Sequence, residues 1–239
     1  MEKWEPGNRK MEQGFARPPD ASAALYFLPG QYLFKLFDDG KETAKALSSE
    51  QVAFAFRDFH TDTGWLDRRV LRYREAPEGN AVLSYEPAGV RGIFVESDNG
   101  EVQRLTLTLP TLILLGKGKD YYLWATSARR VTAKTKLAVA PLPNTGSGLQ
   151  GKICFGKNEV PESRAETLHA VWNLIFNTPF NRDQANNKCH SEPADVRKLL
   201  FRIAKDKSKT FPATQLLTSS TTVGDAWSTI VENKPYYRY

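Results

Sequence analysis

The chain has 239 residues, 41% of them hydrophobic, which is enough for one domain with an extension or for two small domains. Its 33 Lys and Arg residues and 27 Asp and Glu residues give a net charge of only +6, and the basic residues form small clusters. This distribution favours a solvated basic surface over nucleic-acid binding. No apolar run reaches the ~18 residues of a membrane span, and the first residues lack the apolar core of a signal peptide. Two cysteines argue against a disulfide framework. We therefore expect a cytoplasmic protein without membrane contact.

The beginning of the chain combines glycine and proline with charged residues, and we expect residues 1–22 to be a flexible lead-in. Residues 26–37 are apolar and aromatic but are interrupted by Pro29-Gly30. This pattern indicates a strand or a bent hairpin.

A capping-box pattern follows at Ser48-x-x-Gln51. It favours a helix through Val52, Phe56 and Phe59. The alternation of apolar residues in this stretch would also suit a strand.

The pattern between residues 80 and 125 is that of an antiparallel β-meander. Asp98-Asn-Gly100 is a typical tight-hairpin turn. Pro110 interrupts the longest apolar run, which predicts an edge or a bulge at that point. The expected strands are residues 81–85, 92–96, 102–109 and 121–125.

A Pro143-Asn144 pair is followed by a glycine-rich loop and then by Gly151-x-Ile153-Cys154. The loop also fits the Gly-x4-Gly-Lys pattern of a phosphate loop. However, Ile153 stands where Ser or Thr would have to bind Mg²⁺, which argues against nucleotide binding.

A second capping-box pattern, Ser163-x-x-Glu166, predicts the start of a helix. An apolar face at i, i+3, i+4 and i+7 follows it, and the helix is expected to end at residues 177–181. The four residues of this face are Leu168, Val171, Trp172 and Ile175.

This order of motifs resembles the active-site flap of ubiquitin-conjugating (E2) enzymes, where His-Pro-Asn precedes Gly-x-Ile-Cys-Leu by a short loop. Leu142 stands in place of the His, and Phe155 in place of the Leu. The segment ending at Asn181 is similar to the Asp-Pro-Leu-Asn that follows the crossover helix. The resemblance covers residues 80 to 183, and within prokaryotic E2-like proteins it points to family D, protein B of the plasmid-borne PRTRC cassette.

The resemblance implies an α+β fold of the ubiquitin-conjugating type, with a meander, an active-site flap and a helical C-terminal extension. We expect the E2-like domain over residues 23–188 and the extension, packed on it, over residues 189–239. Within the extension, apolar spacing predicts a helix after Pro193 and a short helix opened by Thr222.

The resemblance also implies chemistry. Cys154 would accept the C-terminal carboxylate of a ubiquitin-like protein as a thioester from a ThiF-like (E1) enzyme, and would then pass it to an amine. Asn144 would orient the flap or donate to the developing oxyanion. Thr178 holds the place of a carboxylate that assists in many E2 enzymes, so proton removal could use Asp183, water, or no base.

The same resemblance implies two partners, the activating enzyme and the ubiquitin-like protein, with a JAB-type peptidase in the same system. It implies no small cofactor and no metal for this chain. Lys152 and Lys157 lie close to Cys154 in sequence and could lower the pKa of its thiol.

Three alternatives remain open. Cys154 could be a buried small hydrophobe between Ile153 and Phe155. The fold could be a non-catalytic scaffold, or the chain could be a basic plasmid protein associated with nucleic acid. A zinc site from Cys189, His190 and the scattered other histidines lacks ligand spacing.

Overall fold

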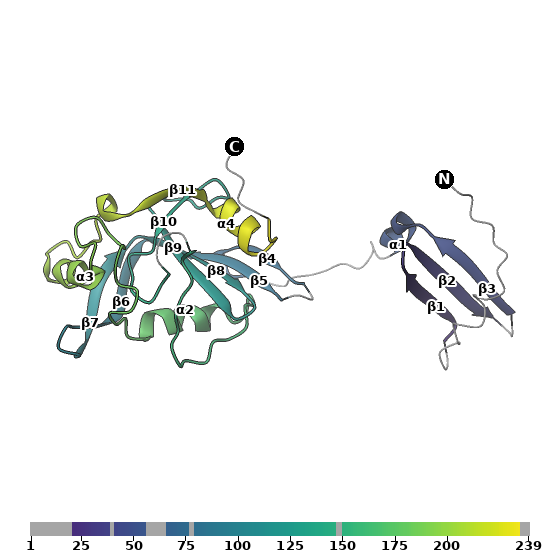
Figure 1. Cartoon of the computed structure of the whole chain (residues 1–239), viewed down its shortest axis with the longest axis horizontal. Helices are drawn as coiled ribbons and strands as arrows, with labels where there is room; N and C mark the ends of the chain where they lie inside the picture. Colours follow the sequence, from purple (N-terminus) through teal and green to yellow (C-terminus); the bar gives the residue numbers. More distant parts are fainter. Residues whose placement is uncertain (1–20, 39–40, 56–65, 77–78, 147–149, 235–239) are drawn as a thin grey trace. The chain divides into compact units, whose positions relative to one another are not determined.

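The computed structural model describes residues 21–38, 41–55, 66–76, 79–146 and 150–234. The chain forms two compact units, Met1–Gly64 and Trp65–Tyr239 (Figure 1). The sequence predicts one domain over residues 23–188, whereas the structure places a unit boundary inside that range. The reason is that the first three described strands pair only with one another.

The first unit is a small antiparallel sheet in the order β1-β2-β3, followed by a short helix. The sequence leaves a strand or a bent hairpin open around Pro29-Gly30, and the structure has a hairpin of β1 and β2. Gly30 provides the positive φ of 78° that its turn requires. The third strand carries no apolar alternation and was not expected. The elements are β1 (Ala23–Leu28), β2 (Gln31–Asp38), β3 (Lys41–Leu47) and α1 (Ser49–Ala55).

The predicted capping box at the start of α1 is confirmed. The Gln51 N–H donates to Ser48 Oγ at 3.2 Å, and the Ser48 N–H donates to Gln51 Oε1 at 3.0 Å. The helix is described to Ala55. Phe56 and Phe59, which were expected to continue it, lie outside the described residues.

The second unit is built on a six-stranded sheet in the order β11-β10-β9-β8-β5-β4, in which each neighbouring pair is antiparallel. Of the four strands expected in the meander, residues 81–85 and 121–125 lie in this sheet, while residues 92–96 and 102–109 form a separate two-stranded ribbon. The strand over Thr111–Lys117, between the two expected strands of the sheet, was not predicted. The strands are β4 (Val70–Arg74), β5 (Ala81–Glu86), β8 (Thr111–Lys117), β9 (Asp120–Thr126), β10 (Lys136–Val139) and β11 (Thr218–Thr222).

A two-stranded ribbon, β6 (Gly89–Glu96) and β7 (Val102–Leu109), continues from β5 and β8. Glu86 pairs with Leu112 and Gly89 pairs with Leu109, so the register is the same on both sides of the break. The break itself contains Pro110, which cannot donate to a ladder. The sequence predicts an edge or a bulge at Pro110, whereas the structure has a break without a change of register, which separates one long hairpin into sheet and ribbon.

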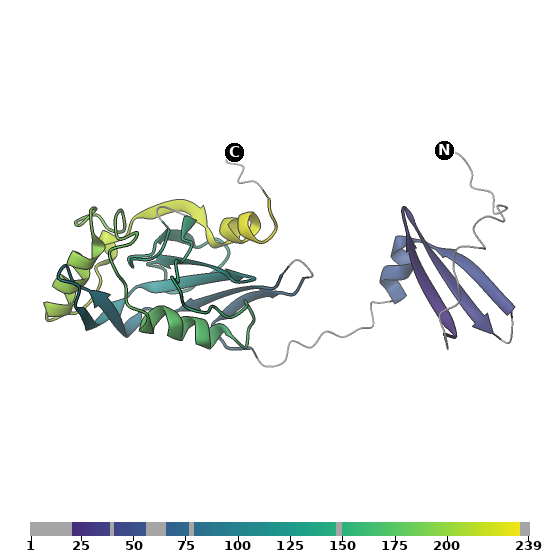
Figure 2. The ribbon, with the colours of Figure 1, turned by 60° about the horizontal axis from the view of Figure 1, so that its bottom comes forward.

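The central strands are buried on both faces. Leu112 and Leu114 belong to one core, while Ile113 and Leu115, pointing the opposite way, belong to another. Helix α2 (Leu168–Asn177) covers the first face and α4 (Val223–Ile230) covers the second (Figure 2). Burial on both faces explains the unbroken apolar sequence of β8.

The start of α2 differs from the prediction. Its N-cap is Thr167, without a side-chain capping bond, so the capping box expected at Ser163 and Glu166 is wrong. Ser163 is instead fully buried beside Gly116, where an added Cβ would lie 2.4 Å from Ser163 Oγ. Tertiary packing therefore overrides the local signal.

The apolar face predicted for α2 is confirmed: Leu168, Val171, Trp172 and Ile175 are its buried residues. The short helix expected from Thr222 is present as α4, and it begins with a capping box that was not predicted. There Thr222 Oγ1 accepts from the Asp225 N–H, and the Asp225 carboxylate accepts from the Thr222 N–H at 2.8 Å.

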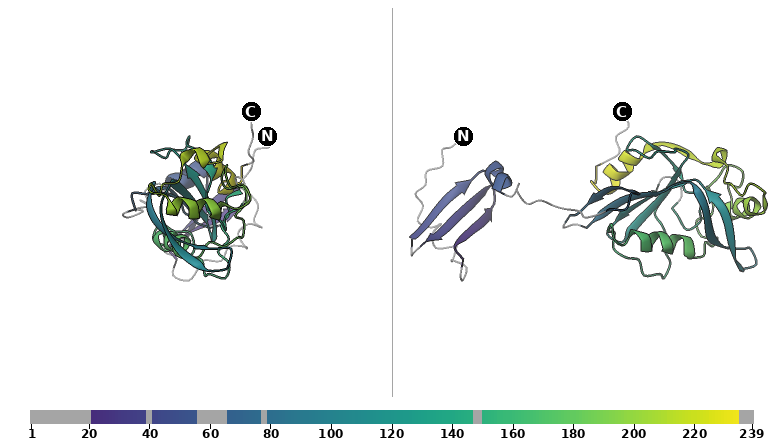
Figure 3. Two further views of the ribbon diagram at one scale, coloured as in Figure 1. Left: turned by 90° about the vertical axis from the view of Figure 1, so that its left-hand side faces the viewer. Right: turned by 180° about the vertical axis from the view of Figure 1, so that it is seen from behind.

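Residues 189–239 contain the two expected helices, α3 (Val196–Lys205) and α4, and a short 3-10 helix, Ala213–Gln215. Helix α3 lies beside β7 (Figure 3). This part of the chain also contributes β11, which pairs with β10 and completes the sheet. The C-terminal part is thus built into the sheet as well as packed on it.

Candidate active site

Residues 143–146 and 150–155, which together we call the flap segment, pair with each other beside β9. Thr145 pairs with Ile153, and the Gly146 N–H donates to the Lys152 carbonyl oxygen at 2.7 Å. The Ile153 N–H donates to Tyr121 O at 2.8 Å, which attaches the returning arm to the sheet. The narrow pairing brings the beginning and the end of the segment together.

Gly151 is required by this fold-back. Its φ is 58°, and an added Cβ would lie 2.7 Å from Trp124 Nε1 and 3.0 Å from Leu123 O. Both the backbone conformation and the close approach to β9 exclude a side chain. The glycine of the predicted Gly-x-Ile-Cys motif therefore has a structural reason.

The two cysteines lie in different environments. Cys154 is exposed, whereas Cys189 is buried and its Sγ lies 3.5 Å from Glu192 O. Burial raises the pKa of the Cys189 thiol, which makes it less reactive. The alternative in which Cys154 is a buried hydrophobe is therefore contradicted.

Cys154 and Asn144, the two predicted site residues, line the same small pocket. Main-chain pairing brings them together, because the Cys154 N–H donates to Asn144 O at 2.7 Å. The pocket is completed by residues of β9, the flap segment and α2 with the chain that follows it. These are Leu123, Thr145, Ile153, Phe155, Leu174, Ile175, Thr178 and Phe180.

The side chain of Asn144 is held against the chain that follows α2. Its Nδ2 donates to Pro179 O at 3.4 Å, while its Oδ1 is buried and has no hydrogen-bond partner among the described residues. Its φ of 57° lies in the left-handed region, which asparagine tolerates better than most residues. Asn144, held in this way, lines the same pocket as Cys154.

Thr178, in the place of the E2 carboxylate, and Asp183, the candidate base, both lie in the chain that follows α2. Thr178 lines the pocket, as its place in the motif predicts. The main-chain oxygen of Asp183 accepts a hydrogen bond from the Asn144 N–H at 2.9 Å, and Asp183 is exposed to solvent. The loop after α2 therefore brings one carboxylate residue to the flap segment.

Of the two lysines near Cys154 in sequence, one is paired with an acidic residue. Lys152 Nζ lies 2.9 Å from Asp120 Oδ1, and this hydrogen bond raises the pKa of Lys152. Lys157 is exposed to solvent. Because Lys152 is paired with Asp120, its positive charge is less available to stabilise a thiolate at Cys154.

Sequence reasoning missed Lys188. Its side chain is fully buried, and its Nζ contacts the flap segment at Thr145 and Gly146. In the sequence it ends a polar stretch, where a lysine is normally solvated, so no sequence signal marked it.

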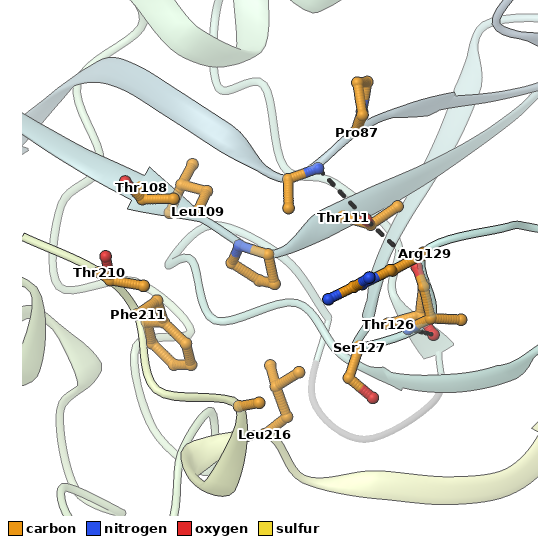
Figure 4. Close-up of a pocket in the computed structure, with 14 residues that line it drawn as sticks. Pro87, Thr108, Leu109, Thr111, Thr126, Ser127, Arg129, Thr210, Phe211 and Leu216 are labelled. Atoms are coloured by element: carbon orange, nitrogen blue, oxygen red, sulfur yellow. Dashed lines mark hydrogen bonds between the residues drawn. The ribbon is translucent and has the colours of Figure 1, made fainter.

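A second, larger pocket of about 350 Å³ lies at the break between ribbon and sheet (Figure 4). The Ala88 N–H donates to Thr111 Oγ1 at 3.2 Å across that break. Of the residues that line it, Arg129 alone is charged. It shares no lining residue with the pocket at Cys154.

Two further properties concern the described residues only. They contain no group of three or more His, Cys, Asp or Glu side chains placed to hold a metal ion, and His60 lies outside them. Across the same described ranges, no helix has the length and apolarity that crossing a membrane requires.

An antiparallel sheet with a helix on its face, and an exposed cysteine in a segment beside it, are features that the E2 resemblance implies. The profile of prokaryotic E2 family D matches residues 43–219, most of the chain, and the protein therefore belongs to this family. The predicted resemblance is confirmed, and the match extends beyond residues 80–183 in both directions. Searches of the curated proteins and of the solved structures gave no significant match.

Proposed function

We propose that this protein is an E2-like carrier: it accepts a ubiquitin-like protein as a thioester on Cys154 and transfers it to an amine. Membership of prokaryotic E2 family D supports this general function. The observation that carries the specific proposal is the contrast between the two thiols. Cys154 is exposed in a pocket that it shares with Asn144, whereas Cys189 is buried.

The loading step exchanges one thioester for another. The Cys154 thiolate attacks the C-terminal carbonyl carbon of the ubiquitin-like protein, which a ThiF-like (E1) enzyme holds as a thioester. A new C–S bond forms at Cys154, the old one breaks, and the activating enzyme's cysteine leaves as a thiolate. The proton of the Cys154 thiol goes to solvent, which an exposed side chain allows.

The discharge step forms an amide. A substrate amine attacks the thioester carbonyl, charge develops on its oxygen, and collapse of the intermediate expels the Cys154 thiolate. The Asn144 amide, which lines the same pocket, is our candidate donor to that oxygen. In other enzymes, loss of one such donor costs about 2.7–4 kcal/mol. The amine proton passes to Asp183 or to water, or leaves without a base.

The resemblance to the PRTRC cassette supplies the proposed partners. They are a ThiF-like activating enzyme, which would use ATP, and a small ubiquitin-like protein. A JAB-type peptidase of the same system would reverse the modification by hydrolysing the amide. We place the reaction in the cytoplasm, where both thiols remain reduced.

The proposal is tested by a thioester assay with the full chain, the ThiF-like enzyme, the ubiquitin-like protein and ATP. We expect an adduct on a non-reducing gel that disappears when a reductant is added, and that Cys154→Ala does not form. Absence of an adduct under conditions where the activating enzyme itself is charged would contradict the carrier function. Binding of the ubiquitin-like protein without an adduct would then favour the non-catalytic E2-fold alternative.

A further inference from the structure

Lys188 is a lysine with a fully buried side chain that lies between α2 and α3. Its Nζ donates three hydrogen bonds to two consecutive residues of the flap segment. The acceptors are Thr145 O at 2.6 Å, Thr145 Oγ1 at 2.9 Å and Gly146 O at 2.8 Å. A protonated ammonium group has three N–H donors, so each one is used.

These bonds act on the part of the flap segment next to the candidate site. Thr145 follows Asn144 directly, and it pairs with Ile153, the residue before Cys154. The chain that carries Lys188 makes a second contact with the same place, because Asp183 O accepts the Asn144 N–H at 2.9 Å. One loop therefore holds the segment at two adjacent points.

Burial of this ammonium group carries a free-energy cost. Burial lowers the pKa of Lys188 to about 8, and the groups that bind it are two carbonyls and a hydroxyl rather than a carboxylate. A side chain such as methionine would occupy the space without this cost. Among the described residues, the hydrogen-bond acceptors of this costly buried charge all belong to the flap segment. This indicates a positioning role, since perturbed groups concentrate at functional sites.

We propose that Lys188 is a positioning residue: its ammonium group clamps the main chain at Thr145 and Gly146, and thereby holds Asn144 in place beside Cys154. The effect on chemistry rests on the proposed function. Loading requires only an accessible thiol, whereas discharge requires the Asn144 amide at a defined place. Loss of the clamp is therefore expected to slow discharge and to leave loading largely unchanged.

The test compares Lys188→Met with a variant that is destabilised elsewhere in the same unit. Methionine keeps an unbranched side chain of similar length but provides no donor. Val223→Ala, in the core on the opposite face of the sheet, is the control. Thr145→Val removes one of the three acceptors and leaves both carbonyls in place, so it provides a milder second variant.

The first measurement is amide hydrogen exchange in the isolated protein. The Gly146 and Cys154 amides donate to Lys152 O and Asn144 O, and we expect both to exchange at least about tenfold faster in Lys188→Met. Amides between β8 and β9 should change no more than they do in Val223→Ala. A smaller increase at the same two amides is expected in Thr145→Val.

The second measurement follows loading and discharge separately. Lys188→Met should load to the parent level and discharge to a small amine at least about tenfold more slowly, while Val223→Ala should do both at the parent rate. Unchanged exchange at Gly146 and Cys154 would overturn the clamp. Changed exchange with parental discharge would overturn its effect on the reaction.

The two proposals fail in different ways. If the parent protein forms no thioester, the carrier function fails, and the exchange measurement still decides whether Lys188 clamps the flap segment. If the parent protein loads and discharges but the two amides do not respond to Lys188→Met, the carrier function stands and the clamp does not.

Discussion

The Cys154 N–H donates a hydrogen bond to the Asn144 carbonyl oxygen at 2.7 Å, so the main chain itself fixes the two candidate site residues against each other. The bond closes the flap segment at its two ends. A change in the backbone at either residue is thus transmitted to the other. Substitutions that act on side chains must be distinguished from substitutions that act on this shared backbone.

The two cysteines should differ in a thioester assay. Cys154→Ala removes the exposed thiol and is expected to abolish the adduct, while Cys189→Ala should still form it. Because Cys189 is buried in the main core, its substitution should lower the free energy of unfolding by about 1–3 kcal/mol. An adduct on the Cys154→Ala protein would assign the chemistry to another residue.

Substitution of Asn144 requires a backbone control. At a φ of 57°, alanine is strained by about 1 kcal/mol, so Asn144→Ala changes both the amide and the main chain. Asn144→Gly removes the amide without that strain. If the amide assists the oxyanion, both variants should load Cys154 and discharge it at least about tenfold more slowly. Slow discharge in Asn144→Ala alone would assign the effect to the backbone.

Several features could be predicted from the sequence because they depend on local patterns. The β1–β2 hairpin, the capping box of α1, the start of α4 at Thr222, and the apolar face of α2 each follow from a few adjacent residues. The proximity of Asn144 and Cys154 followed from motif order. These features need no knowledge of distant contacts.

Other features depend on contacts between distant residues. Ser163 does not cap α2 because it packs beside Gly116, and β11, a run of Thr and Ser, is a strand because β10 pairs with it. Lys188 and Cys189 lie in a polar stretch of sequence but are buried under the flap segment and in the core. No local pattern indicates such burial.

The glycines on either side of Cys154 provide a matched pair. Gly151 and Gly156 have φ values of 58° and 60°, so alanine is strained at both, by about 1 kcal/mol. At Gly151 the new Cβ would also collide with Trp124 and Leu123, whereas at Gly156 no atom lies within 4 Å. We expect Gly151→Ala to cost about 2–4 kcal/mol in denaturant unfolding and to impair loading. Equal costs at the two positions would contradict the close approach to β9.

The C-terminal elements should be necessary for folding. Removal of residues 218–239 deletes an edge strand and uncovers the sheet face formed by Leu83, Ile113 and Leu115. The truncated chain is expected to lose cooperative thermal unfolding. Trp227→Ala, a single change at the centre of that core, should cost about 3–5 kcal/mol. A truncated protein with the parent unfolding temperature would show that β11 and α4 are dispensable.

The stability of the protein should depend on pH through Lys188. Burial lowers the pKa of this group from 10.5 to about 8. Below about pH 8 it is protonated in both the folded and the unfolded state, and it adds no slope. Between about pH 8 and pH 10.5 the unfolded state binds more protons than the folded state, so stability rises with pH in this window.

Other groups of the protein titrate in the same pH range. The contribution of Lys188 is isolated by subtracting the free energy of unfolding of Lys188→Met from that of the parent protein at each pH. From about pH 7.5 to about pH 9.5, the free energy of unfolding of the parent protein should rise by about 2 kcal/mol relative to that of the variant. Denaturant unfolding of both proteins at the two pH values measures this difference. A constant difference would contradict the lowered pKa of Lys188 in the folded protein.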